Sequence, residues 1–215
     1  MRIRLLLATA LLLTGCSTAT PVAPSFNGPT TTCTYTVTGD PARAVDPPNG
    51  TAVPTVGVAT FVLKMSAGEV TITMNRPGAP CTVHSFENLA KQGFYNDTSC
   101  HRLATSGLFM LQCGDPSGTG AGGPGYRYAD ELTPPPTYPA GTVAMANAGP
   151  GTNGSQFFLV FEDTQLPPAY TAFGTMDSAS LDVLRSIAKA GSDGSNPDGT
   201  GKPNAPATIS EVVGG

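Results

Sequence analysis

The chain has 215 residues, a formal net charge of -4 and only 12% charged residues. This composition supplies no basic surface for nucleic acid and no acidic tail, so we expect no nucleic-acid partner. Glycine (26 residues) and proline (21 residues) are abundant, which predicts many turns and little helix.

Residues 1–15 have the features of an export signal. Arg2 and Arg4 precede an apolar run, Leu5–Leu13, that is too short to span a bilayer as a mature helix. The following Leu-Thr-Gly-Cys resembles the bacterial lipobox, after which Cys16 becomes the lipidated first residue. We therefore expect an extracytoplasmic protein anchored to the bacterial cell membrane only through acyl chains on Cys16. The alternative is an ordinary secretory signal peptide.

Four cysteines remain once Cys16 is set aside, and in an exported domain they suggest two disulfides. Three connectivities are possible. Cys100 and Cys113 flank a predicted hairpin, which favours the pairs Cys100–Cys113 and Cys33–Cys81. Free buried thiols are the alternative.

Residues 16–55 are rich in Thr, Pro, Ala and Gly without helical periodicity, which is typical of a tether. Within it, Thr31–Thr38 contains β-branched residues and Tyr35, so part of the tether has the composition to lie on the domain. We place the folded domain at residues 56–215.

The domain begins with a predicted β-hairpin, in which Val70, Ile72 and Met74 alternate with polar residues as in a half-buried strand. The first predicted helix, Thr82–Gln92, has Thr82 as its expected cap. Many short strands and two helices favour an all-β barrel or sandwich. The remaining predicted elements are strands over Gly141–Ala146, Ser155–Phe161 and Ala207–Val213 and a helix over Ser178–Ala190.

Familiar catalytic motifs are weak or missing. Gly118-x-Gly120-x-x-Gly123 matches a dinucleotide fingerprint by letter, but no strand–helix unit surrounds it, so it is interpreted as a flexible loop. The two histidines lack metal-ligand spacing and no Gly-x-Ser-x-Gly occurs. We expect neither a metal nor another cofactor.

Arg102 lies in an apolar hairpin, where an arginine must be paired or used. The first alternative is a structural salt bridge, and the second is a fixed cation beside an apolar pocket. A guanidinium turned away from Phe109 and Phe158, or locked against a carboxylate elsewhere, would overturn the second.

Several blocks, in order along the chain, resemble the cyclophilin family of peptidyl-prolyl cis–trans isomerases. The resemblance covers Val56–Val213 and implies a closed eight-stranded antiparallel barrel capped by two α-helices. The blocks are Phe94-Tyr95-Asn96, His101-Arg102-Leu103, Phe109-Met110-Leu111-Gln112-x-Gly114-Asp115, Met145-Ala146-Asn147-Ala148-Gly149-Pro150 and Asn153-Gly154-Ser155-Gln156-Phe157-Phe158.

The resemblance also implies a site. Arg102 matches the catalytic arginine, Gln112 the glutamine beside it, and Phe109 a third residue of the catalytic group. Gln165 and Tyr170 stand where many eukaryotic members have tryptophan and histidine. The residues expected to bind substrate are His101 at the rim, Met110, Phe158, Leu166 and Tyr170 around the proline, and Ala146, Asn147 and Gln156 along the peptide backbone.

The expected activity is isomerisation of X–Pro bonds in exported proteins, by a monomer that assists folding without a covalent intermediate. Two other interpretations remain. One is a module that binds proline-containing polypeptides with little turnover, and the other is a structural envelope lipoprotein.

Overall fold

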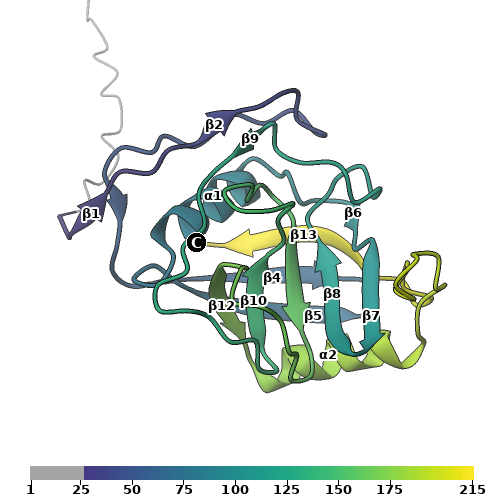
Figure 1. Cartoon of the computed structure of the whole chain (residues 1–215). Coiled ribbons are helices and arrows are strands. Elements are labelled where there is room, and N and C mark those ends of the chain that lie inside the picture. Colours follow the sequence, from purple (N-terminus) through teal and green to yellow (C-terminus); the bar gives the residue numbers. More distant parts are fainter. Residues whose placement is uncertain (1–26) are drawn as a thin grey trace, which may run out of the picture.

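The computed structural model describes residues 27–215, which form one nine-stranded sheet, two two-stranded sheets and two helices (Figure 1). Cys16 and the predicted signal lie outside the described residues. The strands are β1 (Thr30–Thr31), β2 (Thr36–Val37), β3 (Val53–Pro54), β4 (Val58–Met65), β5 (Gly68–Asn75), β6 (Thr98–Ser99), β7 (Arg102–Ser106), β8 (Leu108–Cys113), β9 (Tyr126–Arg127), β10 (Thr142–Met145), β11 (Phe157–Val160), β12 (Ala172–Met176) and β13 (Thr208–Gly214), and the helices are α1 (Pro80–Lys91) and α2 (Ser178–Lys189).

The main sheet is antiparallel throughout and has the order β6-β13-β4-β5-β12-β10-β11-β8-β7. It curls into a half-barrel, with α2 along one end in Figure 1. The predicted mostly-β fold with two helices is confirmed. The closed eight-stranded barrel is not, because this sheet has nine strands and no described ladder joins β6 to β7. These end strands are separated along the chain only by Cys100 and His101.

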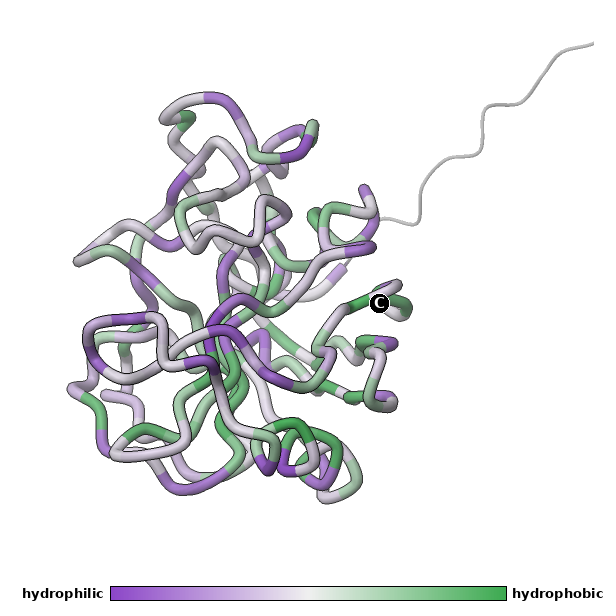
Figure 2. Tube along the Cα trace, turned by 90° about the vertical axis from the view of Figure 1, so that its right-hand side faces the viewer, coloured by the Kyte–Doolittle hydropathy of each residue, from purple (hydrophilic) through white to green (hydrophobic). Residues whose placement is uncertain are grey.

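Alternation along the strands produces two apolar clusters, one on each face of the sheet. The main core contains Leu103, Leu111 and Phe157, each with an exposed fraction of 1% or less. Burying such side chains contributes roughly 1.5–3 kcal/mol each. Figure 2 shows that apolar stretches follow the strands and α2, while the outer loops are mostly hydrophilic or neutral. The smaller cluster, called the outer cluster below, consists of Ala104, Met110, Tyr138, Ala144, Phe158 and Val160.

Helix α1 packs its Phe86 ring into the main core. The ring centroid of Phe86 lies 5.7 Å from Phe61 of β4, 5.6 Å from Phe157 of β11 and 5.9 Å from Phe173 of β12. Aromatic pairs at such separations are favourable beyond their buried area. One helical residue therefore joins three strands that are far apart in the sequence.

The start of α1 differs from the prediction that Thr82 caps it. The helix begins two residues earlier, after Ala79, whose side chain forms no cap. The carboxylate of Glu131 accepts the N–H groups of Cys81 and Thr82, both at 2.9 Å, and the Thr82 hydroxyl at 2.7 Å. A negative charge is favourable at this positive end of a helix. The capping group thus comes from a distant loop.

Residues 27–55 lie on the domain, as β1, β2 and the chain beyond them show in Figure 1. Strand β2 pairs with β9, and the Tyr35 hydroxyl donates to the Cys81 carbonyl at 2.7 Å. Arg43 donates to the carbonyls of Gly93 and Phe94, just beyond α1. The disulfide Cys33–Cys81 fastens the segment, and Cys100–Cys113 is the second bridge, which confirms the predicted pairing.

Replacing Cys33 and Cys81 together by serine should lower the free energy of unfolding by about 2–4 kcal/mol. The bridge closes a loop of 48 residues, and loop-closure entropy in the unfolded chain scales with that length. Urea unfolding followed by circular dichroism measures the change. Val37→Ser, at an exposed position of the same segment, is the control and should change the free energy by less than about 0.5 kcal/mol. Equal midpoints for the wild type and the double variant would contradict the expectation.

Candidate active site

The register of three neighbouring strands places the central side chains of the predicted site on one face. Arg102 of β7 is paired with Gln112 of β8, and Gln112 is paired with Phe158 of β11. Directly opposed residues of antiparallel strands share a face. Met110, two residues before Gln112, shares it as well. A cation, an amide and two apolar side chains therefore project from one side of the sheet.

The outer cluster covers the apolar part of this face. Leu166, Tyr170 and Ala146 pack against it from the loops, beside the buried side chains of Met110 and Phe158. The rings of Phe158 and Tyr170 meet edge to face, with centroids 5.7 Å apart. Five predicted substrate-binding residues are thus brought together around one apolar group.

Arg102 is held by three hydrogen bonds. Its Nε donates to Thr200 Oγ1 at 2.9 Å, Nη1 to Gln112 Oε1 at 3.3 Å, and Nη2 to Asp198 Oδ2 at 2.7 Å. The contact with Asp198 is the salt bridge of the first alternative, while the contact with Gln112 keeps the guanidinium at the predicted site. The Arg102 and Asp198 side chains are 28% and 53% exposed. An ion pair this open to water contributes only about 0–1 kcal/mol to stability.

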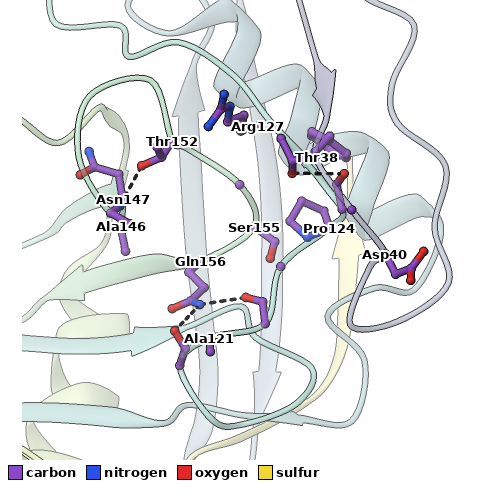
Figure 3. A pocket seen from close by; sticks show the side chains of 18 of the residues that line it. Thr38, Asp40, Ala121, Pro124, Arg127, Ala146, Asn147, Thr152, Ser155 and Gln156 are labelled. Carbon is purple, nitrogen blue, oxygen red and sulfur yellow. Dashed lines mark hydrogen bonds between the residues drawn. The ribbon is translucent and has the colours of Figure 1, made fainter.

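Gln112 continues the hydrogen-bond network away from Arg102. Its Nε2 donates to Gln156 Oε1 at 2.8 Å. Gln156 Nε2 in turn donates to the carbonyls of Gly120 and Gly122, both at 2.9 Å (Figure 3). The loop that matched a nucleotide fingerprint by letter therefore supplies two backbone acceptors for Gln156, one of them at the pattern position Gly120.

Asp115 fixes this glycine-rich loop from the inside. Its Oδ2 accepts the N–H groups of Gly120 at 2.7 Å and Gly122 at 3.0 Å, and Oδ1 accepts that of Ser117 at 2.7 Å. Burial acts to raise the pKa of Asp115, but the bonds from Ser117, Gly122 and Gly120 outweigh it, so the pKa lies below its usual value. The carboxylate stays ionised at neutral pH and holds the loop closed around it.

The polar site residues open onto a cavity of about 520 Å³ (Figure 3). Gln112, Ala146, Asn147 and Gln156 line one side of it. The glycine-rich loop next to Gln156 and residues 38–40 of the N-terminal segment complete the lining. A cavity with many exposed backbone groups is suited to an extended peptide.

Asn147 lines the cavity but its amide is already engaged. Nδ2 donates to the Ala169 carbonyl at 2.9 Å, and Oδ1 accepts the Gly149 N–H at 3.2 Å. The side chain therefore fixes the neighbouring loops.

Two predicted residues lie outside the central group. Phe109 alternates with Met110 along β8, so its ring packs against the main core, 6.2 Å from Phe161. His101 precedes β7 and lies beside Gly120, where an added Cβ would come within 3.3 Å of the imidazole. Burial lowers the pKa of His101, and neither ring nitrogen has a hydrogen-bond partner within residues 27–215.

Sequence reasoning missed Tyr138, a member of the outer cluster whose hydroxyl binds the backbone of Tyr170. Its hydroxyl accepts the Tyr170 N–H at 3.0 Å and donates to the Tyr170 carbonyl at 2.9 Å. Its ring lies 6.1 Å from Phe158 and 6.2 Å from Tyr170. The only sequence feature that could have pointed to this role was a tyrosine within a proline-rich loop, and that feature does not indicate which backbone group it would bind.

Residues 27–215 contain no group of three or more His, Cys, Asp or Glu side chains arranged to hold a metal ion. Neither α1 nor α2 has the length and apolar character needed to cross a membrane.

Comparison with known proteins identifies the family. Residues 60–213 match the model of the cyclophilin type peptidyl-prolyl cis-trans isomerase/CLD family. The chain is 46% identical over 195 residues to a probable peptidyl-prolyl cis-trans isomerase B of Mycobacterium leprae, covering 82% of this chain and 66% of that protein. It is 38% identical over 177 residues to peptidyl-prolyl cis-trans isomerase A of Mycobacterium tuberculosis, covering 74% of this chain and 93% of that protein.

A solved structure agrees with these matches. The crystal structure of a cyclophilin type isomerase from Cryptosporidium parvum superposes with a TM-score of 0.65 at 28% identity, covering 74% of this chain and 98% of that one. The chain belongs to the cyclophilin-type peptidyl-prolyl cis–trans isomerase family. It spans 61–66% of the length of the mycobacterial isomerase B relatives.

Tyr138→Phe should lower the free energy of unfolding by about 1–2 kcal/mol, because the substitution leaves the backbone N–H and carbonyl of Tyr170 unpaired in a buried setting. Thermal unfolding measures this loss, and isothermal titration with a proline peptide should show weaker binding as the loop loosens. Tyr35→Phe is a matched control, because it removes a hydroxyl bond on the N-terminal segment. It should affect stability but not peptide affinity. Unaltered stability and affinity in Tyr138→Phe would refute the assigned role.

Proposed function

We propose that this protein is a peptidyl-prolyl cis–trans isomerase acting on X–Pro bonds of exported proteins. The observation that carries the proposal is the common face shared by Arg102, Gln112, Met110 and Phe158. Family membership supports the reaction class. One Cryptosporidium relative was crystallised in the presence of the dipeptide Ala-Pro, at 29% identity to this chain and a TM-score of 0.64, and this supports a proline-containing substrate.

The reaction requires rotation about a bond with partial double-bond character, whose barrier is roughly 18–20 kcal/mol. X–Pro bonds populate both isomers but exchange only over tens to hundreds of seconds. In the twisted transition state, amide resonance is lost and the nitrogen regains its lone pair. A catalyst must therefore bind the twisted form better than either planar form.

In the proposed mechanism these tasks fall to separate residues. Met110, Phe158, Leu166 and Tyr170 surround the proline ring by apolar contact. Arg102 donates to the prolyl amide as electron density shifts there, a preorganised electrostatic effect. An arginine suits this task since it remains charged and carries five N–H groups in one plane. Three of these are used within the protein, which leaves two.

No proton transfer, nucleophile or cofactor enters this mechanism. His101 has no assigned chemical step, and the bonds of Gln112 and Gln156 serve to keep the guanidinium and the cavity wall in place. The donors are therefore already oriented before the substrate arrives, so little reorganisation is needed in the transition state.

The place of action is part of the same proposal. The Leu-Thr-Gly-Cys pattern supports lipidation at Cys16 and an extracytoplasmic location at the bacterial membrane. The two disulfides support an oxidising compartment. We further propose that the curled sheet works as a closed barrel in solution, since only two residues separate its end strands, and that the protein acts as a monomer.

Arg102→Ala should reduce kcat/KM for an X–Pro peptide at least tenfold, equivalent to about 1.4 kcal/mol of barrier, while the fold persists. A protease-coupled assay measures the rate, and circular dichroism checks the fold. Arg185→Ala is the matched control, because Arg185 is also an exposed arginine in a salt bridge, with Glu162 at 2.8 Å. Its activity should equal that of the wild type.

The same assay separates the proposal from its rival, a binding module with little turnover. That module predicts peptide affinity together with a rate equal to the uncatalysed one. A structural envelope protein would show neither affinity for proline peptides nor an isomerisation rate above the uncatalysed one. Normal turnover by Arg102→Ala would remove the arginine from the mechanism.

A further inference from the structure

The loop between α2 and β13, residues 191–206, is fastened to the strand that carries Arg102. The Leu103 N–H donates to the Gly201 carbonyl at 2.7 Å, and the Gly201 N–H donates back to the Leu103 carbonyl at 3.3 Å. Within the loop, Asp193 Oδ1 accepts the N–H groups of Ser195 and Lys202. The loop therefore has its own internal support at the edge of β7.

Asp198 is held by Thr200 through one carboxylate oxygen and by Arg102 through the other. Its Oδ1 accepts the Thr200 N–H at 3.0 Å and the Thr200 hydroxyl at 2.6 Å, while Oδ2 accepts from Arg102 Nη2 at 2.7 Å. The bonds from Thr200, together with that from Arg102, lower the pKa of Asp198 to about 2. The carboxylate is therefore ionised throughout the neutral range. Thr200 also accepts the Arg102 Nε–H, so two neighbouring loop residues grip the same guanidinium.

We infer that Asp198 and Thr200 are positioning residues for Arg102: they fix its guanidinium so that one N–H on each terminal nitrogen stays free for the substrate. The inference rests on the proposed function and extends it to a loop that the site motifs do not include. It concerns orientation, since neither residue is required to touch the peptide.

Orientation outweighs charge neutralisation for two reasons. The bond from Arg102 to Gln112 is long, at 3.3 Å, and leaves a flexible side chain weakly restrained by itself. Asp198 is 53% exposed, so water and salt screen its charge at a distance while the direct hydrogen bond remains. Removing Asp198 should therefore reduce catalysis by loosening Arg102 more than it increases catalysis by leaving the positive charge of Arg102 less neutralised.

Asp198→Asn tests the inference in the full chain, because the amide retains an oxygen for Thr200 and loses the charged acceptor for Arg102. We expect kcat/KM to fall about threefold to tenfold, mainly through kcat, with an unchanged melting temperature. In an Arg102→Ala background the same change should have no further effect. Glu211→Gln is the control, since Glu211 pairs with Lys64 at 2.8 Å and is 48% exposed. It should leave the rate as in the wild type.

Activity equal to or above that of the wild type in Asp198→Asn would overturn the inference. So would an equal loss in the presence and absence of Arg102, since that result describes a residue acting elsewhere. Thr200→Val provides a second variant, which removes the acceptor for Arg102 Nε and should lower kcat in the same direction.

A readout without turnover keeps this test apart from the proposed function. In protein labelled with ¹⁵N-arginine, hydrogen exchange of the Arg102 Nε–H with water should accelerate at least about threefold in Asp198→Asn and in Thr200→Val. Unchanged exchange in both would refute the positioning role, even in an active enzyme. Accelerated exchange in a protein that lacks isomerase activity would support the positioning of Arg102 and reject the reaction.

Discussion

The pairing of β7 with β8 and of β8 with β11 is the constraint on which the site depends. Gln112 is opposed to Arg102 on one side and to Phe158 on the other. Because side chains alternate, a slip of one residue in either ladder would turn the arginine or the phenylalanine into the main core. The core residues Leu103, Leu111 and Phe157 prevent this, since the same slip would expose them to water.

Two kinds of support meet at Arg102 and have different physical origins. On the cavity side, a relay of amides runs from Gln112 through Gln156 to the glycine-rich loop, which the ionised Asp115 holds in shape. On the opposite side, Thr200 and Asp198 of the 191–206 loop accept one N–H group from Nε and one from Nη2. The apolar contacts lie apart from both, in the outer cluster. In the proposed mechanism, the outer cluster would hold the proline ring while the two supports orient the cation.

Local patterns were sufficient for much of the fold and for the heart of the site. Alternation predicted the first hairpin, helical spacing predicted both helices, and the motif blocks located Arg102, Gln112 and Phe158. Strand β12 was not predicted, since it has only five residues and Gly174 interrupts them. Phe109 packs against the main core and not beside Met110 in the outer cluster. The cause is that adjacent residues of a strand face opposite sides of the sheet.

Contacts between distant segments account for what the sequence did not reveal. Asp198 lies 96 residues from Arg102 in a polar loop without periodicity, and Glu131 reaches the start of α1 from 49 residues away. Tyr138 acts through a backbone 32 residues further on. Such partners are set by the tertiary fold, and no spacing rule in a single sequence anticipates them.

One wall of the cavity is formed by the N-terminal segment, which lies outside the region that matches the family model. Thr38, Gly39 and Asp40 line the cavity, while the family match begins at residue 60. At Gly39 an added Cβ meets no atom within 4 Å, so this wall has room for a larger side chain. A small molecule seated there would touch a surface absent from isomerases built of the matched region alone. A ligand bound at this wall would therefore distinguish this chain from family members that lack the segment.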